Sequence, residues 1–207
     1  NETLRPVFYQ RKWEYDKCDK HTIFLSQATY PIKGFHKVLK AMPLILKQFP
    51  DTKLNIAGNS IVGKPFYKIS GYDKYIRTLV RKLNLGDNVC FLGTLTEEQM
   101  CEQYLKTNVF VCPSSIENSP NSLGEAQLLG VPCIASYVGG TMDMMGGNEL
   151  GLYRFEEVEM LAFMVCCIFK SEKMQIINNA QIRHSRDFNA KRLIEIYSII
   201  NDCYVGK

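Results

Sequence analysis

The chain has 207 residues, of which 46% are hydrophobic and 22% charged, and its formal net charge is +4. This composition is typical of a globular protein with one α/β domain or a tight pair of domains. The small, scattered charge argues against a nucleic-acid-binding protein. No apolar run reaches the roughly 18 residues that a membrane span needs.

Eight cysteines occur, and none forms a C-x-x-C pair. Most of them lie in apolar runs that are typical of strands or helices. This pattern predicts buried free thiols in a reducing cytosol, in preference to disulfides or a metal site.

Residues 1–20 are polar and charged, and we interpret them as the connection between two domains, with a short edge strand at Val7–Tyr9. The first residue is Asn1, and no signal-peptide pattern follows it. We therefore expect a piece of a longer protein. Residues 21–207 are expected to form one folded domain.

Short apolar strands alternate with helical patterns through the rest of the chain. The predicted strands are residues 22–27, 53–57, 88–92, 109–112, 133–135 and 151–155. The predicted helices are residues 35–49, 74–85, 96–106, 122–129, 141–145, 158–169, 171–186 and 189–205. This alternation predicts an α/β fold with a doubly wound parallel sheet. In such a sheet, ligands bind at the carboxyl ends of the strands.

The stretch from Val109 to Gly140 carries the chemistry that points to a ligand. A buried strand leads into a loop that contains Glu117, and a helix with Glu125 follows. Two carboxylates and the N–H groups of a helix N-terminus are thus predicted at the carboxyl end of one strand. Carboxylates accept hydroxyl donors and main-chain amides hold phosphates, so this pattern suits a nucleotide-sugar.

Each of the two acids has a simpler explanation. Ser122-Leu-Gly-Glu125 fits a capping box, in which the serine and glutamate side chains satisfy backbone N–H groups at the start of a helix. Capping and ligand binding are compatible for Glu125, because a carboxylate has two oxygens. Capping does not explain Glu117, for which the alternative is a solvated loop acid.

This region resembles the EX7E signature of retaining glycosyltransferases of the GT-B fold, family 4 in particular. Seven residues separate Glu117 from Glu125, and Gly130-Val-Pro132 and Val138-Gly-Gly140 follow. The resemblance extends from about Thr22 to the last helix. It implies the Rossmann-like carboxyl-terminal half of a GT-B fold, which binds the donor. The whole enzyme would move a sugar from a nucleotide-sugar, which we expect to be UDP-linked, to a polysaccharide or glycolipid acceptor.

The resemblance also implies roles for individual residues. Glu117 would contact hydroxyls of the donor sugar and stabilise positive charge near the anomeric carbon. Glu125 would hold the ribose hydroxyls. Lys33 would meet the diphosphate, with a surface lysine as the alternative. The other residues implied to bind the donor are Gly93, Thr94 and Leu95 at the nucleobase, and Asn118, Ser119, Pro120, Asn121, Ser122 and Leu123 at the sugar and diphosphate.

Two features depart from the family pattern. The first strand ends at Ser26-Gln27, where the family usually has Gly-Arg with the arginine on the diphosphate. The loop after Glu117 lacks the glycines that the family often has there. The missing arginine favours one alternative, a non-catalytic domain that binds nucleotide or protein. A nucleotide-sugar epimerase of the same fold is the other alternative.

The expected partners are a nucleotide-sugar donor, a saccharide or lipid-linked acceptor, and an amino-terminal domain of the same protein that this chain lacks. The resemblance places the acceptor site in that domain. No D-x-D or H-E-x-x-H motif occurs, and the family is metal-independent, so we expect no metal and no cofactor. We expect a cytoplasmic protein, or one that is peripheral at the inner membrane through the missing domain.

Overall fold

Six parallel strands form one sheet in the computed structural model, which describes residues 4–58, 66–146, 151–171 and 183–205. The strands are β1 (Thr22–Leu25), β2 (Lys53–Ala57), β3 (Val89–Gly93), β4 (Val109–Cys112), β5 (Cys133–Ser136) and β6 (Leu152–Tyr153). Their order is β3-β2-β1-β4-β5-β6, and every neighbouring pair is parallel. The predicted doubly wound sheet is therefore confirmed.

The direction of winding reverses between β1 and β4, which are neighbours in the middle of the sheet. From β1 the chain proceeds outward to β3, and from β4 it proceeds outward to β6 on the other side. The loops after β1 and β4 consequently diverge at one edge of the sheet. This reversal creates a crevice at the carboxyl ends of the two strands, where open α/β sheets bind their ligands.

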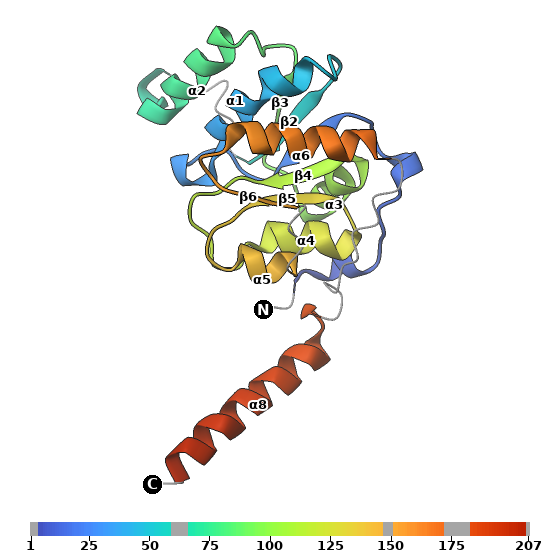
Figure 1. The fold of residues 1–207 in the computed structure, drawn as a ribbon, viewed down its shortest axis with the longest axis vertical. Coiled ribbons are helices and arrows are strands. Elements are labelled where there is room, and N and C mark those ends of the chain that lie inside the picture. The colour runs from blue at the N-terminus through green and yellow to red at the C-terminus, as the bar shows by residue number, and fades with distance from the viewer. Residues whose placement is uncertain (1–3, 59–65, 147–150, 172–182, 206–207) are drawn as a thin grey trace.

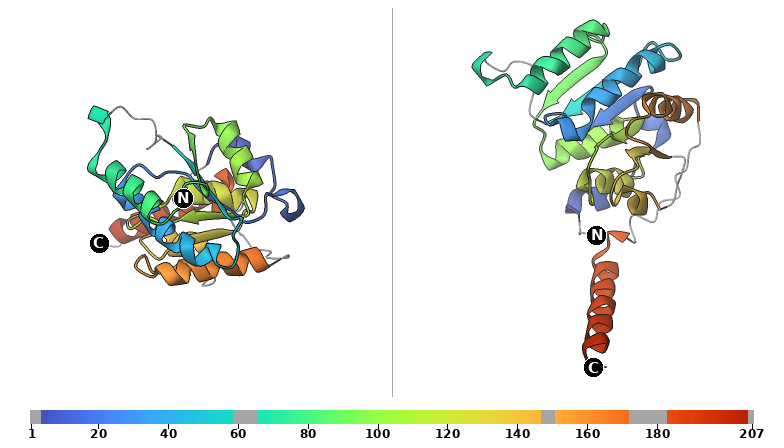
Figure 2. Two further views of the ribbon diagram at one scale, coloured as in Figure 1. Left: turned by 90° about the horizontal axis from the view of Figure 1, so that it is seen from above. Right: turned by 60° about the vertical axis from the view of Figure 1, so that its left-hand side comes forward.

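Helices cover both faces of the sheet (Figure 1). The helices on the sheet are α1 (Phe35–Leu46), α2 (Gly71–Lys82), α3 (Glu97–Lys106), α4 (Asn121–Leu129), α5 (Thr141–Met145) and α6 (Val158–Lys170), and a further helix is α8 (Arg186–Val205). Side chains of α1, α2 and α6 pack on one face, and those of α3, α4 and α5 on the other. Helix α8 projects away from the sheet, as Figure 1 and the right-hand view of Figure 2 show. None of the helices within the described ranges has the length and hydrophobicity to cross a membrane.

The central strands are apolar because both of their faces are buried. In β1, Ile23 and Leu25 point toward the layer of α1 and α6, whereas Phe24 points toward the layer of α3 and α4. The same alternation places Val111 in the first core and Phe110 in the second. Two-sided burial explains why these strands are continuous apolar runs.

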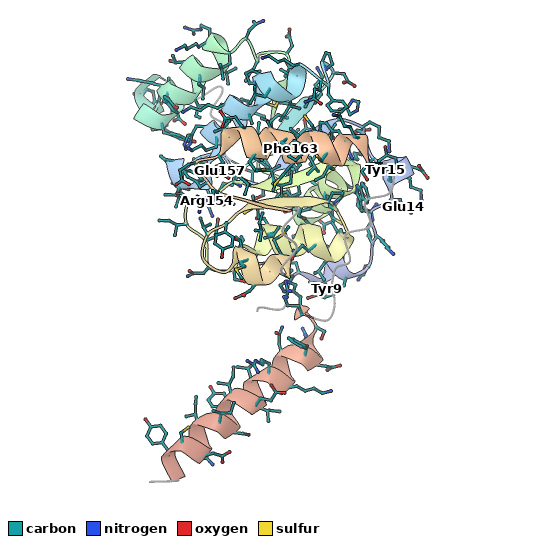
Figure 3. The ribbon with its side chains drawn as sticks, viewed as in Figure 1. Tyr9, Glu14, Tyr15, Arg154, Glu157 and Phe163 are labelled. Atoms are coloured by element: carbon teal, nitrogen blue, oxygen red, sulfur yellow. The ribbon has the colours of Figure 1, made fainter. Side chains whose placement is uncertain are left out.

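The amino-terminal segment packs on α3 and α4. The predicted edge strand at Val7–Tyr9 is wrong, because Pro6 begins a 3-10 helix, Pro6–Tyr9, which buries Phe8. The Trp13 amide donates a hydrogen bond of 2.7 Å to the Leu129 carbonyl at the end of α4. Tyr9 lies at the lower end of the domain in Figure 3, where its hydroxyl donates to the His184 carbonyl at 2.7 Å.

Several helix boundaries differ from the prediction, among them the end of α2 at Lys82 in place of Leu85 and the start of α8 at Arg186 in place of Asn189. Helix α2 begins at Gly71, three residues before the predicted start at Lys74, because Ser70 and Asp73 form a capping box. Helix α1 ends at Leu46, three residues before its predicted end. The capping box predicted from Thr96 is confirmed at the start of α3. Most of the predicted helix 171–186 lies outside the described residues.

All eight cysteines are free thiols. The five that are buried, as predicted, are Cys18, Cys101, Cys112, Cys133 and Cys166. Burial raises the pKa of the Cys112 thiol to about 12, so this thiol stays protonated and unreactive at neutral pH. The prediction of burial is wrong for Cys90, Cys167 and Cys203, which are exposed.

Candidate functional site

The loop between β4 and α4 crosses the carboxyl edge of the sheet beside the loop that follows β1. Glu117 lies in the first loop, and Lys33 lies at the end of the 3-10 turn Pro31–Lys33 in the second. The Lys33 ammonium is 2.5 Å from Glu117 Oε1. Their side chains retain 28% and 12% exposure, respectively, so the ion pair is partly buried but reachable from solvent. The strand order thus brings together two residues that are 84 positions apart in sequence.

A second donor holds the same oxygen of Glu117. The Ser114 hydroxyl donates to Glu117 Oε1 at 2.7 Å, and Ser114 is only 2% exposed. A carboxylate oxygen that accepts two charged or hydroxyl donors is held in a defined orientation. Glu117 is therefore not the freely solvated loop acid that was one explanation of it.

Glycines allow the neighbouring loops to approach the β4–α4 loop closely. Gly34 has φ +70°, and a Cβ atom at that position would lie 1.6 Å from the Pro113 carbonyl oxygen. On the other side, Gly139 has φ +48°, and a Cβ atom there would lie 1.8 Å from the Glu117 carbonyl oxygen. Because no real Cβ fits at such distances, both positions require glycine, and the loop that carries Glu117 is held from two sides.

An open cavity of about 530 Å³ lies beside this loop. Lys33, Glu117 and the five residues from Asn118 to Ser122 line it. Helix α4 begins at Asn121 on its wall, and Pro120 at the N-cap has no side-chain acceptor for the first-turn amides. Amides at a helix N-terminus attract anions. The lining of the cavity therefore includes a cation, Lys33, a carboxylate, Glu117, and the N-terminus of α4, which attracts anions.

A deeper and smaller extension of this cavity reaches between β1 and β4. Its lining includes Ser26 and Gln27, the two residues that stand where the family pattern has Gly-Arg. Lys33 is the cation among the residues that line the two cavities. The positive charge available to an anion in these cavities thus comes from Lys33 and from the start of α4.

Glu125 has a different environment from the one predicted. The capping box from Ser122 to Glu125 is wrong, because α4 begins at Asn121 and Glu125 falls inside the helix. Its side chain is 5% exposed and points toward α3. Glu125 lines neither of the two cavities.

Arg5 from the amino-terminal segment neutralises Glu125. The Arg5 guanidinium donates to Glu125 Oε1 through Nε at 3.0 Å and through Nη2 at 2.7 Å. The Tyr104 hydroxyl approaches the other oxygen at 3.4 Å. Burial raises the pKa of Glu125, and the hydrogen bonds and charge of Arg5 oppose that rise. Glu125 is thus an internal ion-pair partner in this structure.

The remaining residues predicted to bind the donor are Leu123, in α4, and Gly93, Thr94 and Leu95, at the end of β3. Leu123 is fully buried in the core between the sheet and α4, so only its main chain can meet a ligand. Gly93 ends β3 with φ +75° and open space beside it, and Thr94 after it is exposed. Leu95 packs partly against the core. Gly93, Thr94 and Leu95 do not line the two cavities, although they lie at the same edge of the sheet.

Two residues of the site were not predicted. Ser114 precedes Glu117 by three positions, the same S-x-x-E spacing that suggested the capping box at Ser122, so its sequence signal was present. Arg5 had no comparable signal, because it lies 120 positions from Glu125. Within the described part of the chain, no cluster of three or more His, Cys, Asp or Glu side chains is arranged to hold a metal ion.

The chain is similar to known glycosyltransferases. The family model described as "Glycosyl transferases group 1" matches residues 8–182. An uncharacterised glycosyltransferase of Methanocaldococcus jannaschii is 27% identical over 200 residues, which cover 93% of this chain and 48% of that protein. A D-inositol 3-phosphate glycosyltransferase of Corynebacterium urealyticum is 25% identical over 172 residues, which cover 80% of this chain and 40% of that protein.

Solved structures share the fold. Sucrose-phosphate synthase from Thermosynechococcus elongatus superimposes with a TM-score of 0.70 at 25% identity, covering 91% of this chain and 47% of that one. The Anabaena protein HepE, solved in complex with UDP-glucose, gives a TM-score of 0.70 at 21% identity, covering 87% of this chain and 49% of that one. The chain spans 40–49% of the length of these four proteins.

Proposed function

The chain belongs to the group 1 glycosyl transferases, and from this membership we propose that it forms the donor-binding domain of a retaining glycosyltransferase. The donor is a nucleotide-sugar, UDP-linked, and the acceptor of the whole enzyme is a polysaccharide or a glycolipid. The observation that carries the proposal is the Lys33–Glu117 ion pair, which lies in a cavity at the reversal point of the sheet beside the start of α4.

The cavity contains a complementary group for the diphosphate and another for the sugar of such a donor. The diphosphate meets the Lys33 ammonium and the first amides of α4, where a point charge and aligned N–H groups attract oxygen anions. The sugar hydroxyls donate to the Glu117 carboxylate. Without a ligand, Lys33 and Glu117 neutralise each other. With the donor bound, Lys33 turns to the phosphate and Glu117 accepts the sugar.

The same arrangement serves sugar transfer. When the bond between the anomeric carbon and the diphosphate breaks, the leaving diphosphate keeps the electron pair and gains negative charge. Lys33 and the helix N-terminus stabilise that charge, and the carboxylate of Glu117 stabilises the positive charge on the sugar. Each group opposes a charge that grows toward the transition state, which is how fixed dipoles and charges accelerate a reaction.

The choice of a UDP-linked donor rests on relatives of the same fold. HepE has been solved with UDP, with UDP-glucose and with UDP and glucose together. TarM of S. aureus has been solved in a complex that contains UDP. These proteins are similar to the present chain at 15–21% identity. We extend their nucleotide to this chain because the fold is shared and because the cavity offers a cation and helix N–H groups to a diphosphate.

Isothermal titration calorimetry with UDP, UDP-glucose and GDP tests this proposal. We expect the parent chain to bind UDP and UDP-glucose, and Lys33→Met to weaken both about tenfold, because one charge-assisted hydrogen bond to phosphate is lost. We expect Glu117→Gln to weaken UDP-glucose more than UDP. Lys47→Met, which removes an exposed lysine after α1, is the matched control and should bind as the parent does.

One observation favours a second candidate, a non-catalytic domain that binds nucleotide or protein. Ser26 and Gln27 line the deeper cavity, where the family pattern has an arginine for the diphosphate. The same titration distinguishes the candidates. A parent chain that binds UDP and UDP-glucose equally, with no effect of Glu117→Gln, supports the non-catalytic nucleotide-binding domain. A parent chain that binds none of the three ligands supports a domain for protein binding.

A further inference from the structure

We infer that Ser114 is a positioning residue that aims the Glu117 carboxylate at the sugar of the bound donor. The inference rests on the proposed function and adds a residue to it. Ser114 lies at the start of the β4–α4 loop, is 2% exposed, and donates its hydroxyl to Glu117 Oε1 at 2.7 Å. Ser114 lines the smaller cavity but not the larger one, and its hydroxyl is directed at Glu117, so we infer that it acts on the sugar through Glu117.

The two oxygens of Glu117 are in different situations. Oε1 accepts from both Lys33 and Ser114. Among the residues that the structure describes, none donates a hydrogen bond to Oε2. Glu117 lines the larger cavity, so the oxygen without a protein donor is the one available to a sugar hydroxyl. The two donors on Oε1 therefore decide which oxygen of Glu117 the ligand meets.

Ser114 is itself held by a chain of buried hydroxyl groups. The Ser136 hydroxyl, at the end of β5, donates to the Ser114 carbonyl oxygen. The Thr141 hydroxyl, at the start of α5, donates to the Ser136 carbonyl oxygen at 2.6 Å. Ser136 and Thr141 are both 0% exposed. This network ties the main chain at Ser114 to the next strand and helix, so its hydroxyl has a rigid base.

Lys33 cannot hold Glu117 in the donor complex by itself. Its ammonium ends a flexible four-carbon side chain, which keeps 28% exposure, and it is needed by the diphosphate in the proposed complex. When Lys33 turns to the phosphate, Ser114 is the remaining donor on Oε1. The two residues thus act on different parts of the donor: Lys33 on the phosphate and Ser114, through Glu117, on the sugar.

The test compares affinities for UDP-glucose and UDP in the whole chain, measured by calorimetry. We expect Ser114→Ala to weaken UDP-glucose about tenfold, since the orienting hydrogen bond to a charged group is lost, and to change UDP less than twofold. Ser115→Ala is the matched control, because Ser115 is the next residue and, among the described residues, its hydroxyl donates to the Ile32 carbonyl, at 3.4 Å, and not to Glu117. It should leave both affinities unchanged.

Two further variants keep the test decisive if Ser114→Ala is poorly folded by circular dichroism. Ser114→Cys keeps nearly the same volume but donates weakly, and should reproduce the selective loss. In a Glu117→Ala background, Ser114→Ala should cause no additional loss for UDP-glucose, because the two residues act as one unit.

Three results would overturn the inference. They are parental affinity of Ser114→Ala for UDP-glucose, an equal loss for UDP and UDP-glucose, and additive losses in the double variant. Failure of the proposed function has a different signature, because the parent chain and Ser115→Ala would then bind neither ligand, and the inference would fall with it.

Discussion

Glu117 and Glu125 present the same carboxylate in two different electrostatic environments. Glu117, at the edge of the cavity, is paired with Lys33 and is 12% exposed. Glu125, between α4 and α3, is paired with Arg5 and is 5% exposed. A ligand can reach the first acid directly, whereas it must open an internal ion pair to reach the second. The ribose role that the family resemblance implies for Glu125 therefore requires Arg5 to move.

The Arg5–Glu125 pair predicts a stability effect that depends on pH. Arg5→Met should lower the free energy of unfolding by about 2 kcal/mol at neutral pH, because it leaves a buried carboxylate without its partner. The cost is below the roughly 3–5 kcal/mol of a fully buried pair, since the Arg5 side chain keeps 38% exposure. Urea unfolding at about pH 8 measures it.

The direction of the pH effect follows from the pKa of Glu125, which burial raises. A group with a raised pKa in the folded state favours folding when it is protonated, and this contribution is lost as the pH rises through the folded-state pKa. In Arg5→Met the charge of Arg5 no longer opposes the rise of the Glu125 pKa, so this carboxyl is more readily protonated. The loss in free energy of unfolding should therefore be smaller at about pH 5 and complete at about pH 8. Arg11→Met, which breaks the exposed pair with Glu102, should change the free energy of unfolding little at either pH. A pH-independent deficit, or one equal to that of the Arg11 variant, would contradict this account.

Among the secondary-structure elements, three connections lie side by side at the carboxyl edge of the sheet. The loop after β1 contributes Lys33 and Gly34, the loop after β4 contributes Glu117, and the turn after β5 contributes Gly139. The close approaches at the two glycines leave the central loop little freedom to move. The site is thus built on loops, but their positions are set by the strands that they follow.

The close approach at Gly34 predicts a large effect of one methyl group. Gly34→Ala should lower the free energy of unfolding by at least about 3 kcal/mol, because it adds a strained positive φ to an overlap with the Pro113 carbonyl. Gly130→Ala is the control, since Gly130 has φ +83° but nothing within 4 Å of the added atom. It should cost only about 1 kcal/mol. Equal losses in urea unfolding would show that overlap with the central loop is unimportant.

At the scale of the whole molecule, helix α8 exposes large apolar side chains that the core of the domain does not bury. Its large apolar side chains are between 39% and 81% exposed, and they lie on several sides of the helix. They are Phe188, Leu193, Ile194, Ile196, Tyr197, Ile199, Ile200 and Tyr204. None of them belongs to the two core clusters of the described residues. An exposed apolar surface of this kind is a site of association.

The exposure of α8 predicts two outcomes for a chain that ends at Ser185. Its urea unfolding midpoint should stay close to that of the full chain, because the core loses no side chain. In sedimentation velocity, the full chain should self-associate as its concentration rises, whereas the shortened chain should not. A full chain that stays monomeric throughout, or a shortened chain that unfolds at much lower urea, would contradict this prediction.

Local patterns predicted the sheet well because its strands are buried on both faces. Runs such as Val109–Cys112 are apolar at every position, and their alternation with helices leaves few possible topologies. Patterns were less reliable where a single residue decides the local conformation. Pro6 converts a predicted strand into a 3-10 helix, and Ser70 starts α2 three residues early.

The spacing of Ser and Glu shows the limit of sequence reasoning within the site. The S-x-x-E pattern occurs at Ser114–Glu117 and again at Ser122–Glu125. Only the first pair forms a hydrogen bond between its side chains, because α4 begins at Asn121 and carries the second pair into the helix. The position of one helix start, which depends on how α4 packs, distinguishes two identical patterns.

The order of apolar and polar residues by itself determined the parallel sheet and the loop that brings Glu117 to its carboxyl edge. Tertiary structure decided the partners of the charged groups: Lys33 for Glu117 and Arg5 for Glu125. These partners are 84 and 120 positions apart in sequence. Hydrophobic periodicity acts over a few residues, whereas the Coulomb energy of an ion pair depends on distance in space, which only the packed fold sets.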